Sequence, residues 1–172
     1  DNALEIANQD GSRVSNGYVY SIYGQLYIVW RRSKQATKYN KLALDAFSHI
    51  NDQLQDAMII LNLGTSYLHS GNNNLALTHY KKSLEIAKLY EDRFSQSLSY
   101  GQIGNVYSSI YNYEKAIYYL NRSLAINQDF GQVYNVGLIK LFLIEAYQEL
   151  GENQIVEKLL IDANTILKEY TN

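Results

Sequence analysis

The chain has 172 residues, a formal net charge of −2, 17 tyrosines and no cysteine. The lack of cysteine excludes a disulfide framework and a cysteine-based metal site, and the slight negative charge argues against a nucleic-acid surface, which is usually strongly basic. No run of about 18 apolar residues occurs, so the sequence predicts no membrane insertion.

A pattern of small and large side chains recurs every forty residues along the chain. A glycine three positions before a tyrosine begins the pattern, and small residues follow it. Two helices approach closely only where a small residue on one faces a bulky residue on the other, so these columns predict packed helical hairpins, with the tyrosines in the core. The columns are Gly24, Gly64 and Gly104; Tyr27, Tyr67, Tyr107 and Tyr147; Ala36, Ala76 and Ala116; and Ala43, Ser83, Ser123 and Ala163.

Taken in chain order, the pattern predicts four helical hairpins after a short opening segment. Residues 1–10 match the end of a second helix whose first helix is missing, so we expect the chain to be a fragment of a longer protein. Turn residues such as Gly71 and Gly151 separate the two helices of a hairpin. The predicted repeats are 15–50, with helices near 15–30 and 34–49; 55–90, with helices near 55–69 and 73–90; 95–130, with helices near 95–110 and 113–129; and 135–170, with helices near 135–149 and 153–169.

This pattern resembles the tetratricopeptide repeat. Its order is Leu/Ile-Gly-x-x-Tyr, then Ala, then an aromatic residue or Leu, then a small residue. Two features differ from the family: the period is forty rather than about 34 residues, and the chain has no proline. Longer repeats of this kind resemble those of bacterial signalling and regulatory proteins. The resemblance implies an all-α, right-handed superhelical solenoid of antiparallel helix pairs, extending as one domain over residues 1–172.

Signatures of catalysis and of cofactor binding are missing from the sequence. The three histidines, His49, His69 and His79, do not have the spacing of a metal-ligand set, and no cysteine is near them. We therefore predict solvated surface histidines, no metal, no cofactor and no enzymatic activity.

The resemblance also suggests a binding site. In helical-pair solenoids the first helices line the concave side, and in tetratricopeptide families asparagine at two such positions often holds the backbone of an extended peptide. Asn62 and Asn105 match those positions, whereas Gln25, Thr65 and Gln102 are polar approximations. In the last repeat, Phe142 and Glu145 depart from the pattern. The predicted groove residues are Gln25, Asn62, Thr65, Gln102, Asn105 and Glu145, and the alternative is that they are ordinary solvated polar side chains.

The predicted function is therefore a non-catalytic module that binds a protein or peptide segment. By resemblance it is the sensing or regulatory region of a larger bacterial signalling protein, with a separate partner or another part of the parent protein as ligand. Apolar residues near the groove, such as Met58, Leu98 and Leu138, favour an apolar or amphipathic ligand. The alternative is a structural scaffold that self-associates end to end, or through exposed tyrosines among Tyr111, Tyr113, Tyr118 and Tyr119. The sequence leaves cytoplasm and periplasm equally open.

Overall fold

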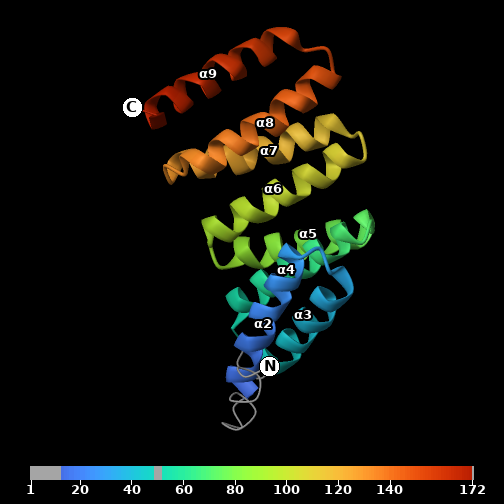
Figure 1. Cartoon of the computed structure of the whole chain (residues 1–172). Helices are drawn as coiled ribbons and strands as arrows, with labels where there is room; N and C mark the ends of the chain where they lie inside the picture. Colours follow the sequence, from blue (N-terminus) through green and yellow to red (C-terminus); the bar gives the residue numbers. More distant parts are fainter. Residues whose placement is uncertain (1–12, 49–51, 172) are drawn as a thin grey trace. The chain divides into compact units, whose positions relative to one another are not determined.

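The computed structural model of the chain describes residues 13–48 and 52–171, which form eight α-helices and no strand (Figure 1). The all-α fold class is confirmed, and every predicted helix within these ranges is present with ends shifted by at most a few residues. The predicted helical segment within residues 1–10 lies outside the described residues. The helices are α2 Arg13–Val29, α3 Ser33–Phe47, α4 Gln53–His69, α5 Asn73–Leu89, α6 Arg93–Ser109, α7 Tyr113–Asp129, α8 Val133–Glu149 and α9 Asn153–Thr171.

The helices belong to two compact units, residues 1–95 and residues 96–172. In the first unit, α2 packs on α3, α3 on α4 and α4 on α5, and α2 also contacts α4. In the second unit, α7 packs on α8 and α8 on α9, while hydrogen bonds from Ser123 and Asn127 join α7 to α6. Each unit therefore contains two of the predicted hairpins. A single continuous solenoid over the whole chain stays a prediction.

Left-handed residues end the helices at a regular spacing. The turn within each hairpin has a positive φ at the same repeat position, with 57° at Arg31, 78° at Gly71, 61° at Tyr111 and 76° at Gly151. A left-handed residue after a helix lets its backbone N–H satisfy a free carbonyl of the last turn. Because the β-carbon makes this conformation unfavourable, glycine is the preferred residue there. The backbone of Arg31 and Tyr111 is therefore strained.

The glycine columns mark close contacts between the helices of a hairpin, as predicted. A β-carbon added at Gly64 would lie 2.6 Å from the ring of Tyr80, and one added at Gly104 would lie 2.7 Å from Cγ of Leu120. Tyr80 and Leu120 are both completely buried. A large residue of the partner helix therefore occupies the space that a side chain at each glycine would need.

The prediction that the tyrosine column forms the core is correct only for Tyr107. Tyr107 is 8% exposed, whereas Tyr27, Tyr67 and Tyr147 are half-buried. The space opposite Gly64 and Gly104 is already occupied by Tyr80 and Leu120, and the rings of Tyr27, Tyr67 and Tyr107 each lie against a ring of the second helix of their hairpin. Ring centroids are 5.3 Å apart for Tyr27 and Tyr39, 5.0 Å for Tyr67 and His79, and 5.5 Å for Tyr107 and Tyr119.

The prediction of solvated surface histidines is wrong for the two that the structure describes. His79 is half-buried, and its Nδ1 lies 2.8 Å from the carbonyl oxygen of Leu75. His69 is also half-buried, and burial, with a smaller contribution from the positive charge of Arg31, lowers its pKa. His49 lies outside the described residues. The His79 ring also lies against the ring of Tyr67, at a repeat position that carries Tyr39 and Tyr119 in the first and third repeats.

Candidate functional site

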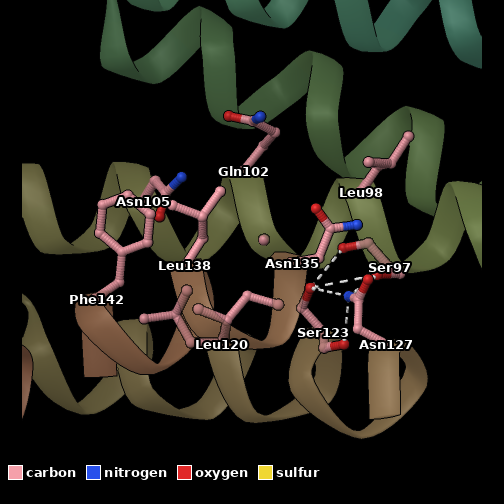
Figure 2. Close-up of a pocket in the computed structure, with 12 residues that line it drawn as sticks. Ser97, Leu98, Gln102, Asn105, Leu120, Ser123, Asn127, Asn135, Leu138 and Phe142 are labelled. Carbon is pink, nitrogen blue, oxygen red and sulfur yellow. Dashed lines mark hydrogen bonds between the residues drawn. The ribbon is translucent and has the colours of Figure 1, made fainter. Parts of the chain in front are cut away.

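A pocket of about 130 Å³ lies in the second unit, between α6, α7 and α8 (Figure 2). Its walls combine large apolar side chains with neutral amides and hydroxyls. None of the lining residues carries a charge. They are Ser97, Leu98, Gly101, Gln102, Asn105, Leu120, Ser123, Asn127, Asn135, Leu138, Ile139 and Phe142.

One wall of the pocket is Gly101, at a repeat position where the first repeat has Ser21 and the second and fourth repeats have leucine. Leu61 occupies the equivalent position forty residues earlier, where it is only 6% exposed, and Leu141 occupies it forty residues later. A β-carbon at Gly101 would lie 3.3 Å from Oγ of Ser123, with no backbone atom of another helix within 4 Å. The pocket therefore exists where the third repeat lacks a side chain that the second repeat has.

Ser97, Ser123 and Asn127 form the polar floor of the pocket, and hydrogen bonds link these three residues to one another. Oγ of Ser123 donates to the carbonyl oxygen of Ser97 at 2.9 Å, and Nδ2 of Asn127 donates to the carbonyl oxygen of Ser123 at 2.9 Å. The same amide nitrogen also donates to Oγ of Ser97, as the dashed lines in Figure 2 show. All three residues are buried. The floor is a fixed network that links α6 to α7.

Two predicted groove residues, Gln102 and Asn105, line this pocket one helical turn apart on α6. Asn105 and Phe142 of α8 both line the pocket (Figure 2). Oδ1 of Asn105 is buried and has no hydrogen-bond partner among the described residues. A buried acceptor without a partner costs about 1–3 kcal/mol, so a hydrogen-bond donor at this oxygen, from water or from another molecule, would be favourable.

The other predicted groove residues lie elsewhere. Asn62 is half-buried on α4, and its Nδ2 is buried without a partner in the described part of the chain. The Thr65 hydroxyl accepts a hydrogen bond from the Tyr80 hydroxyl at 3.1 Å and donates to the Leu61 carbonyl at 3.3 Å. Gln25 is exposed on α2, and Glu145 is exposed on α8 outside the pocket lining.

Several lining residues were missed from the sequence. Phe142 was set aside as a departure from the family pattern, and Ser97, Asn127 and Asn135 were not considered. One signal was available: Gly101 replaces a leucine that the neighbouring repeats keep. A missing large residue in an otherwise periodic helix face indicates local space.

Residues 13–48 and 52–171 also lack the features of two other kinds of site. No three His, Asp or Glu side chains gather there in a way that could hold a metal ion. Over the same residues, no helix is both long enough and apolar enough to span a bilayer.

Paired antiparallel helices with a forty-residue repeat define a helical-repeat protein. Residues 56–129 match the Tetratricopeptide repeat family, so the chain carries a tetratricopeptide-repeat-like domain, as the sequence indicated. A search of curated protein sequences found no match.

Three solved structures illustrate the likeness. The chain is similar to BtubC from P. vanneervenii, with a TM-score of 0.81 and 22% identity over 91% of this chain and 65% of that one. It is similar to a signal transduction ATPase with a tetratricopeptide repeat sensor from Pyrococcus horikoshii, with a TM-score of 0.87 and 20% identity over 98% and 26% of the two chains. A Rap protein complexed with competence and sporulation factor gives a TM-score of 0.78 and 17% identity over 98% and 48%. At these identities the likeness shows the fold alone, and the chain spans less than two thirds of each.

Proposed function

We propose that this protein-interaction module binds a peptide or protein segment without catalysis, and that the α6–α8 pocket is its principal binding site. The observation that carries the proposal is the unpartnered, buried Oδ1 of Asn105 at the pocket. A peptide backbone supplies N–H donors at regular intervals, so a bound segment can satisfy this oxygen whatever its sequence. Gln102, one turn away, can donate to and accept from the same backbone.

The first unit offers a second, separate contact of similar chemistry. Nδ2 of Asn62 is a buried donor without a partner among the described residues, so it can donate to a backbone carbonyl. In contrast, the Thr65 hydroxyl already holds Tyr80, so its role is structural in this proposal. Gln25 and Glu145 are exposed and contribute, at most, solvated contacts at the edge of a bound segment.

A sensing or regulatory role is the fuller form of this proposal. The Rap protein is named as a complex with competence and sporulation factor, and the Pyrococcus protein as having a tetratricopeptide repeat sensor. We propose by analogy that this chain is the ligand-reading part of a larger bacterial signalling protein, and that its partner is a separate peptide or another segment of the parent.

A matched pair of asparagine substitutions tests the proposal. Asn105→Ala removes the unpartnered acceptor, whereas Asn121→Ala makes the same chemical change at an exposed position of α7 outside the pocket. The wild type and both variants, checked for equal helicity, are titrated as bait in lysate of the source organism, and captured proteins are quantified by mass spectrometry. One lost hydrogen bond corresponds to roughly fivefold weaker capture.

A partner weakened by Asn105→Ala and unaffected by Asn121→Ala would support the proposal. Equal capture by all three proteins would contradict it. The competing function is a self-associating scaffold, favoured by Tyr111 and Tyr118, which are 80% and 54% exposed. A molar mass above that of the monomer, reduced by Tyr111→Ser or Tyr118→Ser but not by Asn105→Ala, would favour the scaffold.

A further inference from the structure

We propose that the α6–α8 pocket selects one uncharged, apolar side chain of the bound segment, of a size between leucine and phenylalanine. This inference rests on the proposed function, because it assigns a side-chain specificity to the same site. Under this inference, recognition at the pocket depends on the sequence of the ligand. Amide contacts to the backbone of the ligand, in contrast, do not depend on its sequence.

The volume of the pocket limits what it can hold. At about 130 Å³, it is slightly smaller than an engineered cavity of about 150 Å³ lined by leucine, isoleucine and phenylalanine that binds benzene. One aliphatic or single-ring aromatic side chain fits in such a space. Two side chains or an indole ring would not fit without movement of the walls.

The lining disfavours charged side chains because it offers them no opposite charge. Leu98, Leu120, Leu138, Ile139 and Phe142 contribute apolar surface, and no lining residue is charged. A lysine or glutamate side chain entering the pocket would lose hydration and gain no opposite charge. The hydroxyls and amide of the floor already bond to one another. An apolar side chain loses no hydrogen bond on entry and gains burial.

Gly101 distinguishes the third repeat from its two neighbours, which have Leu61 and Leu141 at this position. In the second repeat the equivalent residue is Leu61, a large side chain that is buried. The protein can therefore read one residue of a ligand at this point. Asn105, on the next turn of α6, also lines the pocket, and its unpartnered Oδ1 is the acceptor that we assign to a backbone N–H near that anchor. The two features together favour a peptide over a free apolar molecule, because a hydrocarbon would leave the acceptor unsatisfied.

The test uses a displayed library of random seven-residue peptides, selected on the full 172-residue chain. Selections run in parallel on the wild type, on Gly101→Leu, which restores the side chain found in the second repeat, and on Gly137→Ala. The last variant is a matched control, because a β-carbon at Gly137 meets nothing within 4 Å and Gly137 does not line the pocket. A further variant, Leu138→Glu, places a charge at an exposed rim position, so it does not depend on packing inside the core.

We expect peptides from the wild type and from Gly137→Ala to share one position held by leucine, isoleucine, methionine or phenylalanine. Gly101→Leu should weaken these peptides roughly 10- to 100-fold, which corresponds to losing the burial of one such side chain. Leu138→Glu should shift the preference toward lysine at the same position. Amide chemical shifts of Leu98, Gly101 and Leu138 in the wild type should move on addition of acetyl-leucine methylamide, and not on addition of acetyl-glutamate methylamide.

Two other outcomes have separate meanings. If peptides are enriched equally by the wild type and by Gly101→Leu, with no shared apolar position, the pocket inference is wrong and peptide binding stands. If no variant enriches any peptide and acetyl-leucine methylamide causes no shift at the pocket, both the inference and the proposed peptide function fail.

Discussion

The steric role of the repeated glycines can be tested with two identical substitutions at different places. Gly64 and Gly137 both lie inside helices, in α4 and α8. Replacing a mid-helix glycine by alanine stabilises a helix by about 1 kcal/mol, because the unfolded chain loses less entropy. At Gly137 nothing lies within 4 Å of the new β-carbon, so Gly137→Ala should raise the free energy of unfolding by about 0.5–1 kcal/mol.

At Gly64 the same β-carbon would lie 2.6 Å from two ring atoms of Tyr80, which is completely buried. The ring cannot turn away into solvent, so the helices must separate, at a cost of about 1–3 kcal/mol. After the helix-propensity gain, Gly64→Ala should be destabilising by about 1 kcal/mol. The difference between the two variants isolates the steric contribution.

Native-state hydrogen exchange is the appropriate assay, because Gly64 and Gly137 belong to different compact units and exchange reports the amides of each unit separately. Amides of α4 and α5 should lose protection in Gly64→Ala, and amides of α8 should gain protection in Gly137→Ala. Equal stabilisation by both substitutions would refute the close approach of α4 and α5 at this point.

Three further predictions follow from buried or strained groups. Burial raises the pKa of Tyr80 to about 12, so the folded state keeps a proton that the unfolded chain releases above about pH 10. The free energy of unfolding should therefore fall by about 2–3 kcal/mol between pH 10 and 12, and Tyr80→Phe should abolish this decrease in alkaline denaturation. Glu91→Gly should stabilise by about 1 kcal/mol in urea, because Glu91 has a φ of 54° where Gly131 occurs forty residues later; an unchanged midpoint would contradict the strain. Asp162→Asn should reduce exchange protection in α9 at pH 7 by about 1 kcal/mol or more, because buried Lys140 loses its partner at 3.3 Å; unchanged protection would contradict this.

The helices could be predicted from the sequence because their signal is redundant. Each hairpin repeats the same alternation of glycine or alanine with large residues, so errors at single positions do not shift the register. Gly104 and Leu120 illustrate this: their contact follows from the same columns that place Gly64 against Tyr80. The burial of the tyrosines could not be read in the same way. A periodic tyrosine indicates a shared environment. Whether its ring is buried in the core depends on whether another side chain already occupies the space opposite the glycine.

The candidate site was predicted only in part for a related reason. Asn105 and Gln102 were found because they occupy positions that carry amides in the family. The remaining walls come from α7 and α8, and residues such as Asn127 and Phe142 reach the pocket only through the packing of three helices. Sequence periodicity describes what the repeats share, whereas this pocket involves Gly101, a position at which neighbouring repeats differ.

A departure from the pattern is therefore informative only together with the space around it. Asn40 replaces the large residue that Tyr80 and Leu120 provide in the next two repeats, and it is completely buried. Its Nδ2 donates to the carbonyl oxygen of Ala36, and its Oδ1 has no partner among the described residues, as at Asn105. However, a β-carbon at Gly24 would overlap the Asn40 amide, so α2 closes over this oxygen and leaves no space for a ligand. Both asparagines carry the free-energy cost of a buried acceptor without a partner, but only Asn105 lines the α6–α8 pocket. We therefore assign binding to Asn105 and not to Asn40.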